Sequence, residues 1–340
     1  MTPDFTGTCL LHIFLLTYNR ETTFRRTLEA IAASPLKDHP LTVMDNCSTD
    51  GTPGVCREFS PLLPRMQVLR HARNIGFGAN YLRALELSQG EYTWVLCDDD
   101  TIFPDRIDAL LDLLRTAGPE ACFVGGPRQE DWPAGLNLRP LDLQRDCRTF
   151  ITGPSFVPAV IFKSSLIGSL ELIDGYFSIR TNFPQMIIGK KLIDGNIPCA
   201  VLKPPVIRRE EPAEKGANAI GVIDGWSAYC RTLPPALRQE GFYSFFAAPN
   251  MSGMLKDVMR TVIWAKVERS SDPDFHLARI GANMGGSIRM ALILCRLASL
   301  APAGVYNFAR ETYRKIKYGW LRKPLPPTYH VPIAEDDLRR

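Results

Sequence analysis

The sequence predicts an α/β fold, with a mostly parallel central sheet flanked by helices and a mainly helical C-terminal extension. The chain has 340 residues, of which 45% are hydrophobic and 22% are charged, and this balance is typical of a folded globular protein. Through its first half, short apolar segments alternate with segments in which apolar residues recur at helical spacing. Such alternation indicates strand–helix–strand units, whose crossover helices connect parallel strands and cover the sheet.

The first half contains five expected strands and four expected helices. Ser48, Thr49 and Asp50 supply capping oxygens before Pro53, which suits the first turn of a helix. The strands are short apolar runs, whereas the helices have apolar residues three and four positions apart. The expected strands are Leu10–Leu16, Leu41–Met44, Met66–Leu69, Tyr92–Cys97 and Cys122–Val124, and the expected helices are Glu21–Ala33, Pro53–Phe59, Ala79–Leu87 and Arg106–Leu114.

The alternation fades after about Asn137, and the second half is more helical. Its expected elements are a strand at Ala159–Phe162, helices near Ser164–Leu170 and Phe183–Ile193, a loop over 208–218, and helical sequence from Phe245 to Tyr318. We therefore expect one α/β domain over residues 1–240 and a helical region over residues 241–340.

Several classes of protein are disfavoured by composition. Met1–Thr8 carries acid and proline instead of the basic and apolar segments of a signal peptide. The apolar segment Met290–Tyr306 is interrupted by Arg296 and Pro302, so it is too short for a transmembrane helix. A net charge of +4 does not favour nucleic acid as a partner. The nine cysteines have no C-x-x-C spacing, which favours reduced thiols in a cytoplasmic protein.

The acidic triplet Asp98-Asp99-Asp100 directly follows the apolar strand Tyr92–Cys97. Ligands of open parallel sheets bind beyond the carboxyl ends of the strands, so three carboxylates are expected to face that crevice. Adjacent acids repel one another, and oxygen ligands suit Mg²⁺ or Mn²⁺, which commonly bridges substrate phosphates. The alternative is a solvated acidic turn that caps the helix from Asp105. Placement at a strand end favours the metal site.

Two other strand ends open onto the same edge of the sheet. The first expected strand ends in Thr17-Tyr18-Asn19-Arg20, and the second ends at Asp45, before the stretch that runs to Thr52. The aromatic face of Tyr18 suits stacking on a nucleobase, and Asp45 suits a ring N–H or a ribose hydroxyl. For Asp45 a capping role is an equal alternative, and for Asn46, Ser48 and Thr49 turn and capping roles are favoured.

A basic loop with glycines runs from Arg70 to Asn80 into a helix. Glycine lets the backbone approach a ligand closely, a helix start offers free N–H groups, and Arg73 adds a fixed cation. This loop suits an anionic diphosphate, although Gly and Asn also mark ordinary loops.

In this order, the three stretches resemble family 2 of the glycosyltransferases, which are inverting enzymes with the GT-A fold. The resemblance is clear over Leu10–Leu114. It implies nucleoside contacts from Tyr18, Asp45 and Arg73, with Asn80 and Asp98 near the ribose and donor sugar. The D-x-D signature of the family fits Asp98 and Asp100, and Asp100 is implied as the principal metal ligand. The expected donor-binding residues are Thr17, Tyr18, Arg20, Asp45, Arg73, Asn74, Gly76, Asn80, Asp98 and Asp99, and the expected metal ligands are Asp98 and Asp100.

The catalytic base departs from the pattern of the family. That base commonly lies in a Glu-Asp pair about a dozen residues before a glycine; if Gly195 is that glycine, Phe183 and Pro184 stand in its place, with Asn182 and Gln185 beside them. Asp174 is the first substitute, and Glu210 or Glu211 follows.

By resemblance, the expected activity is metal-dependent transfer of a sugar, with inversion, from a UDP- or dTDP-sugar to a glycan or lipid-linked glycan. Mn²⁺ or Mg²⁺ is the expected cofactor, and assembly of a bacterial surface polysaccharide or lipopolysaccharide is the expected pathway. One alternative is a sugar nucleotidyltransferase, which should have a glycine-rich, basic loop after its first strand. Another is an inactive nucleotide-sugar-binding module, suggested by the missing Glu-Asp pair.

Residues 289–323 join an apolar stretch to a basic one with interleaved aromatics. Such a segment suits peripheral attachment to an anionic membrane, here the cytoplasmic face of the inner membrane. The alternative is packing against the catalytic domain or against a second subunit in a homodimer.

Overall fold

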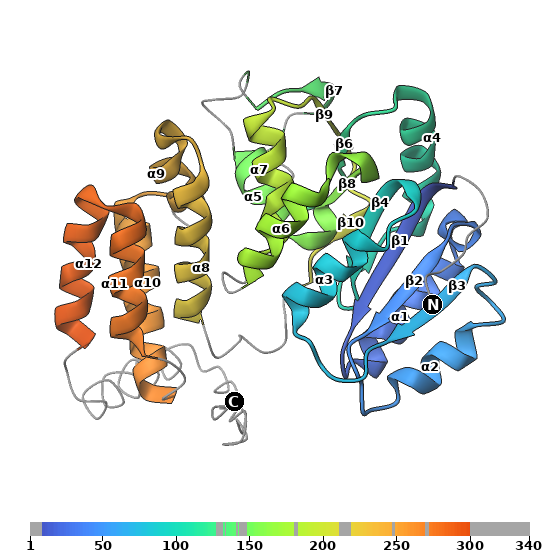
Figure 1. Ribbon diagram of the computed structural model, residues 1–340, viewed down its shortest axis with the longest axis horizontal. Helices are drawn as coiled ribbons and strands as arrows, with labels where there is room; N and C mark the ends of the chain where they lie inside the picture. The colour runs from blue at the N-terminus through green and yellow to red at the C-terminus, as the bar shows by residue number, and fades with distance from the viewer. Residues whose placement is uncertain are drawn as a thin grey trace, which may run out of the picture.

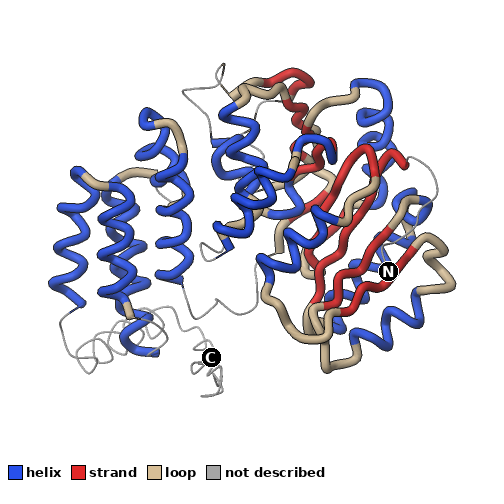
Figure 2. Tube along the Cα trace, in the orientation of Figure 1, coloured by secondary structure: helices blue, strands red, loops and turns tan. Residues whose placement is uncertain are grey.

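The computed structural model describes residues 9–126, 132, 134–140, 142, 148–179, 183–210, 219–246, 249–268 and 272–299. Within them, the strands gather in one part of the molecule, and a group of helices forms the other (Figures 1 and 2). No helix in these ranges is both long enough and apolar enough to cross a membrane. The cysteines in the described part of the chain are free thiols, as expected.

The central sheet has eight strands in the order β3-β2-β1-β4-β8-β6-β9-β7. Its first four strands are parallel, with β1 between β2 and β4, whereas β8 is antiparallel to both of its neighbours. A separate two-stranded sheet pairs β5 with β10. The strand bounds are β1 Cys9–Thr17, β2 Leu41–Asp45, β3 Met66–Arg70, β4 Gly90–Cys97, β5 Thr101–Ile102, β6 Ala121–Phe123, β7 Gly135–Leu138, β8 Val160–Lys163, β9 Cys199–Val201 and β10 Ile207–Arg208.

The register of the parallel strands places their functional ends side by side. Thr17 of β1 is paired with Asp45 of β2, and Leu16 is paired with Cys97 of β4. Strand β1 is buried from Leu11 to Thr17, as expected for a central strand covered on both faces. Its one histidine, His12, bonds to Thr42 at 2.9 Å, and burial lowers the pKa of His12 to about 4.

Seven helices belong to the sheet part of the described chain. Helices α1 and α2 pack against each other, as do α3 and α6. Their bounds are α1 Glu21–Ala32, α2 Thr52–Phe59, α3 Phe77–Glu86, α4 Ile107–Ala117, α5 Arg148–Thr152, α6 Ser169–Phe177 and α7 Met186–Asp194, with short 3-10 turns at Pro35–Asp38, Pro104–Arg106, Gly153–Ser155, Val157–Ala159 and Ser164–Leu166.

The helical region begins at α8 and extends through α12. Helix α8 packs against α9, α10 and α11, and its Asp224 is buried with His276 at 2.9 Å and Arg279 at 3.4 Å. The expected boundary at residue 240 falls inside α9. Helix α8 lies before that boundary but packs with the C-terminal helices. The bounds are α8 Ala219–Thr232, α9 Pro235–Ser244, α10 Met251–Glu268, α11 Pro273–Met284 and α12 Gly286–Ser299.

The expected elements of the first half are found, each within three residues of its predicted bounds. In the second half, the expected strand at 159–162 is β8 and the expected helix at 183–193 is α7. The helix expected at Ser164–Leu170 was wrong: a 3-10 turn ends at Leu166, and α6 begins only at Ser169. Asp174, the first substitute for the catalytic base, lies in α6.

Candidate functional site

A pocket of about 380 Å³ lies at the carboxyl ends of β1 and β4 and at the start of α3. This size falls within the range of small-molecule sites, roughly 300–1,000 Å³. It brings together eight of the expected donor-binding residues, whereas Asp45, Arg73 and Asp100 do not line it. The lining residues are Leu16, Thr17, Tyr18, Arg20, Asn46, Asn74, Gly76, Phe77, Asn80, Cys97, Asp98 and Asp99.

The turns after β1 and β2 are held together by Asn19. The Asn19 amide donates to Ser48 Oγ at 3.0 Å, and its side-chain oxygen accepts from the Thr49 amide at 2.7 Å. Asn19 has a φ of 52°, a left-handed conformation that asparagine tolerates better than most residues. The turn roles expected for Ser48 and Thr49 are thus observed, and both strand ends are fixed in relation to each other.

Asp45 has the capping role that was one of its two expected roles. It is buried at the end of β2, and its Oδ1 accepts from the Ser48 amide at 2.8 Å. Arg70 Nε lies 3.7 Å from the other oxygen, Oδ2. In this arrangement Asp45 stabilises the turn after β2 and does not line the pocket. Its contact with a nucleoside stays a prediction.

The loop before α3 is shaped by two asparagines. Asn46 Oδ1 accepts from the Ile75 amide at 2.9 Å, and Asn46 Nδ2 donates to Asn74 Oδ1 at 2.8 Å. Asn74 Oδ1 also accepts from the Gly76 amide at 2.8 Å. Gly76 has a φ of 80° and open space where a side chain would begin, so its backbone conformation is what requires glycine.

Asn80 and Arg73 differ in their placement. Asn80 is buried in α3, where its Nδ2 donates to the Met44 carbonyl at 3.1 Å and its Oδ1 contacts His71 at 2.8 Å. Asn80 therefore fixes the start of α3 against β2 while one side of it reaches the pocket. Arg73 is exposed on the loop and lies outside the pocket lining.

Asp98 and Asp100 are buried carboxylates with little compensation. Asp98 is 4% exposed and Asp100 is 5% exposed, and burial raises the pKa of each to about 7. The Thr17 hydroxyl and Arg20 partly oppose this shift for Asp98, whereas the Asp99 charge adds to the shift for both carboxyls. Within the described chain, neither Asp98 Oδ2 nor the Thr17 hydroxyl makes a hydrogen bond of normal geometry. Two such carboxylates are more readily accommodated beside a cation.

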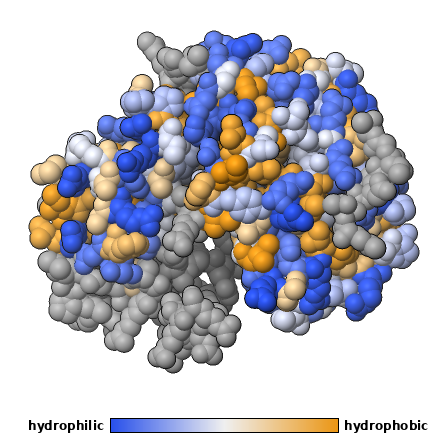
Figure 3. Space-filling model, in the orientation of Figure 1, coloured by the Kyte–Doolittle hydropathy of each residue, from blue (hydrophilic) through white to orange (hydrophobic). Residues whose placement is uncertain are grey.

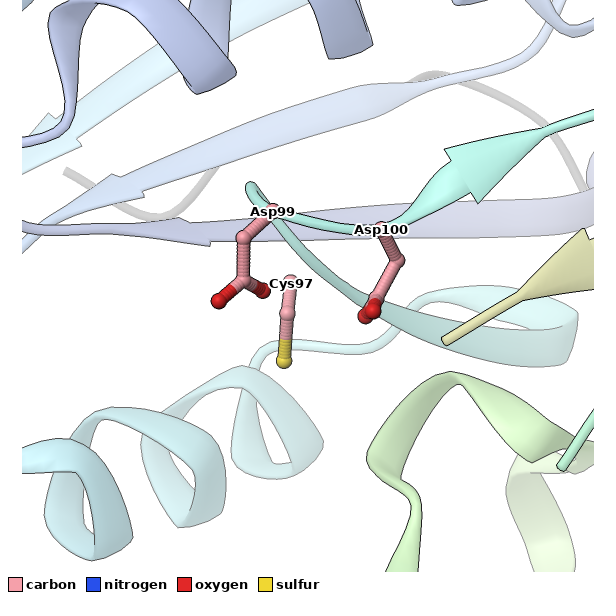
Figure 4. Close-up of side chains that lie close together, drawn as sticks. All are labelled: Cys97, Asp99 and Asp100. Atoms are coloured by element: carbon pink, nitrogen blue, oxygen red, sulfur yellow. The ribbon is translucent and has the colours of Figure 1, made fainter. Parts of the chain in front are cut away.

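Cys97 joins Asp99 and Asp100 in a group whose potential metal-ligating atoms lie within 4.8 Å of one another (Figure 4). Asp98, one of the two expected ligands, lies outside this group. Burial and the three neighbouring carboxylates raise the pKa of Cys97 well above its ordinary value, so the thiol is neutral. Cys97 was not among the residues predicted from the sequence, although its position directly before the triplet was an available signal.

Arg20 crosses from the start of α1 to the acidic triplet. Its Nη1 forms an ion pair with Asp99 Oδ2, and its Nε lies 3.9 Å from Asp98 Oδ1. Arg26, further along α1, donates instead to the backbone carbonyl of Asp99 at 3.2 Å. The rim of the pocket thus holds a guanidinium against two of the three carboxylates.

A second pocket of about 590 Å³ lies between α6, α7 and α8. Asp174, the candidate base, is exposed and lines this pocket and not the first one. Two lysine–acid pairs, Lys190 with Asp194 and Lys191 with Glu171, lie along it. The lining residues are Glu171, Asp174, Phe177, Ser178, Phe183, Met186, Ile187, Lys190, Lys191, Asp194, Gly195, Ala228, Tyr229 and Thr232.

The start of α3 packs against the segment just before α7. A Cβ on Gly78 would lie 3.2 Å from Pro184 Cγ, so there is little room for a side chain at Gly78. Phe183, at the position where the family commonly has a carboxylate, packs its ring 5.4 Å from that of Trp226. The position is occupied by a core aromatic residue that links the sheet part to α8.

Glu210, the next candidate base, lies beside Asp100. Its amide donates to Asp100 Oδ1 at 3.3 Å, and its carboxylate accepts from Thr101 and from Arg208. These hydrogen bonds lower the pKa of Glu210, which makes it a weaker base. Glu211 and Asn182 lie outside the described residues.

Comparison with protein families finds one matching model, that of glycosyl transferase family 2, over residues 12–161. EpsH of Bacillus subtilis, described by name as a glycosyltransferase, is 30% identical over 112 residues, which are 33% of this chain and 31% of EpsH. The succinoglycan biosynthesis protein ExoO of Rhizobium meliloti is 29% identical over 103 residues, covering 30% of this chain and 29% of ExoO. The chain therefore spans about a third of the length of these relatives.

Solved structures of two proteins show the same fold. TarS of S. aureus (residues 1–349) has a TM-score of 0.55 at 16% identity, covering 85% of this chain and 92% of TarS. A second TarS structure holds UDP-GlcNAc, with a TM-score of 0.53 at 14% identity and the same coverage. The mannosyltransferase PcManGT of Pyrobaculum calidifontis, solved with GDP-Man and Mn²⁺, has a TM-score of 0.50 at 17% identity, covering 90% and 84%. The expected GT-A-like fold, with its helical C-terminal region, is confirmed.

Proposed function

Because residues 12–161 match the model of glycosyl transferase family 2, we propose that this chain transfers a sugar from a nucleoside diphosphate donor to a glycan-containing acceptor. The observation that carries the proposal is the pocket at the ends of β1 and β4, where the buried, poorly compensated Asp98 and its neighbour Asp99 line a volume suited to a small ligand. Donors named with the two structural neighbours, UDP-GlcNAc and GDP-Man, belong to the same chemical class.

The residues present fit a divalent cation. Asp99 and Asp100 offer oxygen ligands close together, and Asp98 has one buried oxygen without a hydrogen bond in the described chain. Such oxygen donors suit Mn²⁺ or Mg²⁺, and Mn²⁺ is present with PcManGT. We propose that Asp99 and Asp100 hold the ion with Asp98 beside them. A bound ion would stabilise the negative charge that develops on the departing nucleoside diphosphate.

The other walls of the pocket suit the nucleotide. Tyr18 is 43% exposed, so its ring is accessible for stacking on a base, which for a UDP- or dTDP-sugar is a pyrimidine. The Asn74–Gly76 loop leads into the first turn of α3, whose free N–H groups suit phosphate oxygens. Arg73 and Asp45 are the further nucleoside contacts that we propose, each reached by adjustment of its side chain or turn.

We propose that the second pocket receives the acceptor and that Asp174 takes the proton from the attacking hydroxyl. The hydroxyl oxygen then forms a bond to the anomeric carbon while the bond from that carbon to the diphosphate breaks on the opposite face, which inverts the centre. General-base catalysis of this kind contributes on the order of 10²- to 10⁴-fold in rate. The pocket suits an acceptor with polar and apolar parts, because two lysine–acid pairs and several aromatic residues line it.

Exposed apolar side chains on α6 favour a lipid-linked form of that acceptor. Leu170, Ile173 and Phe177 recur at helical spacing, and Phe177 is 83% exposed at the edge of the second pocket. Figure 3 shows this apolar patch near the centre of the visible face. Such a stripe suits an isoprenoid or acyl chain. Assembly of a bacterial surface polysaccharide from a cytoplasmic donor pool is the pathway that we propose, in keeping with the name of ExoO.

Helix α12 supports peripheral contact with a membrane. Met290, Ile293 and Leu297 are exposed on its outer side, with Arg289 and Arg296 next to Met290 and Leu297 in the sequence, and form the apolar patch at the left of Figure 3. We propose that this side contacts anionic lipid on the cytoplasmic face of the inner membrane. The rest of the predicted segment, residues 300–323, lies outside the described residues. Failure to co-sediment with anionic liposomes at low salt would remove this proposal, and a concentration-dependent dimer would identify a second copy as the occupant.

The donor proposal is tested by thermal shift with UDP, dTDP and GDP and their sugars, with and without Mn²⁺. Ligands that bind only the folded state raise its apparent stability by mass action. We expect a shift for one nucleotide that requires Mn²⁺ and disappears in Asp100→Ala. Asp105→Ala is the matched control, because Asp105 is an exposed carboxylate a few residues further along the chain. No shift with any nucleotide would refute the proposal, and pyrophosphate release from a nucleoside triphosphate and a sugar phosphate would identify a nucleotidyltransferase.

A further inference from the structure

Arg20 holds a positive charge where the proposed metal ion would bind. Its Nη1 forms an ion pair with Asp99 Oδ2, and its Nε lies 3.9 Å from Asp98 Oδ1. A guanidinium stays charged at any pH at which the protein is folded. Asp99 belongs to the group with Cys97 and Asp100 whose potential ligand atoms lie within 4.8 Å of one another. One carboxylate is therefore shared between an ion pair and a candidate metal site.

The backbone at Arg20 is fixed, whereas its side chain is free to move. Arg20 is the N-cap residue of α1 and follows Asn19, whose bonds to Ser48 and Thr49 hold the turn to the end of β2. The Arg20 side chain is 48% exposed, so it can leave Asp99 without disturbing the core. It also lines the first pocket beside Thr17 and Tyr18, which means that a released guanidinium remains next to the donor.

We propose that Arg20 and the divalent cation compete for Asp99, and that cation binding transfers the Arg20 guanidinium from Asp99 to the diphosphate of the donor. The inference rests on the proposed function, since it requires a metal ion at the triplet and a diphosphate in the pocket. A dication on Asp99 occupies the carboxylate and repels the guanidinium, which weakens the ion pair. The planar fork of arginine matches phosphate oxygens as well as carboxylate oxygens, so the freed group has a new partner in the donor.

The competition predicts effects of opposite sign when Arg20 is removed. Without nucleotide, loss of the competing cation should tighten metal binding. With nucleotide, loss of the phosphate partner should weaken binding of the diphosphate. A residue that only supports the fold would weaken both, and a residue that only binds the donor would leave the metal affinity unchanged.

The test measures Mn²⁺ binding by the full chain without nucleotide, from the EPR signal of free Mn²⁺, and then UDP binding by calorimetry in saturating Mn²⁺. The variants are Arg20→Gln, Arg20→Lys and the matched control Arg26→Gln. Arg26 donates to the backbone carbonyl of Asp99 at 3.2 Å. Its replacement therefore removes a positive charge near Asp99 without releasing the Asp99 carboxylate from its ion pair with Arg20. Exposed ion pairs contribute little free energy, so removing this one in Arg20→Gln should raise the Mn²⁺ affinity by about two- to five-fold.

In Arg20→Gln, UDP affinity should fall about ten-fold or more, because a charge-assisted contact with phosphate is lost. Arg20→Lys should keep a Mn²⁺ affinity near that of the wild type, since it retains the charge, and should still bind UDP more weakly. Arg26→Gln should change the Mn²⁺ affinity less than Arg20→Gln does. Unchanged or weaker Mn²⁺ binding by Arg20→Gln, beside a wild type that binds Mn²⁺, would overturn the inference and leave the proposed function standing. A wild type that binds neither Mn²⁺ nor UDP would overturn both.

Discussion

Replacing Asp100 by asparagine should stabilise the metal-free protein at alkaline pH, although the residue belongs to the proposed metal site. Burial raises the pKa of Asp100 from an ordinary 3.8 to about 7. Because the folded-state pKa is the higher one, the folded protein binds this proton more tightly than the unfolded chain does. Stability is therefore greatest below pH about 4, falls as pH rises toward 7, and stays low above it.

The size of the effect follows from the difference between the two pKa values. A difference of about 3 corresponds to roughly 4 kcal/mol in the free energy of unfolding, as an upper limit for a carboxyl that is almost fully buried. Relaxation of the turn and of nearby solvent reduces such penalties, so we expect a gain of about 2 kcal/mol at pH 8. Asparagine retains the oxygen that accepts from the Glu210 amide, and no hydrogen bond need be lost.

The assay is urea denaturation followed by circular dichroism at pH 5 and pH 8, with a chelator present. Asp100→Asn should exceed the wild type in stability by a larger margin at pH 8 than at pH 5, whereas Asp105→Asn, at an exposed carboxylate, should match the wild type at both. If Asp100→Asn is as stable as the wild type or less stable at pH 8, the carboxylate is compensated in the metal-free protein, and the electrostatic argument for the cation fails.

Three further results are expected. Excess Mn²⁺ should raise the thermal midpoint of the wild type more at pH 8 than at pH 5, since protonated carboxyls compete with the ion; an equal rise at both would argue against the triplet as ligand. Gly76→Ala should lower the free energy of unfolding by about 1 kcal/mol because the φ of Gly76 is 80°, and it should also weaken UDP binding. Gly118 has a φ of 54° and does not line the pocket, so Gly118→Ala should lower stability without affecting UDP binding. Asp174→Asn should lower kcat by about 10²-fold or more while the KM for the donor stays the same. Asp194→Asn in the same pocket serves as its comparison, and equal activities would remove Asp174 as the base.

The first half of the fold was predictable because its signals are local. Strands β1 to β4 are short apolar runs, their helices have clear periodicity, and parallel strands bring their ends to one edge whatever the loops between them do. That geometry alone placed Thr17, Tyr18 and Asp98 around one pocket. In the second half, β8 and β6 pair antiparallel and α6 begins after a 3-10 turn, and neither feature has a periodic signature in the sequence.

Within the site, it was easier to predict which residues take part than to predict where their side chains point. The triplet was evident, but which carboxylates converge depends on the turn after β4, which groups Asp99 and Asp100 with Cys97 and directs Asp98 toward Arg20. Asp45 was ambiguous because capping and ligand roles call for the same carboxylate. The absence of a base at Phe183 was visible in the sequence. The packing of Phe183 against Trp226 was not, because that contact joins the segment before α7 to α8, residues far apart in the sequence.

The two pockets share no lining residue in the described chain, although α3, which borders the first pocket, packs against α6, which borders the second. One is built by strand ends and α3, and the other by α6, α7 and α8, so the lining of one can be altered without changing the lining of the other. A chimera that exchanges only the α6–α8 stretch between relatives of this fold should therefore change the proposed acceptor site while it keeps the proposed donor site. Under the proposed function, recognition of the acceptor can thus diverge during evolution while recognition of the donor is retained.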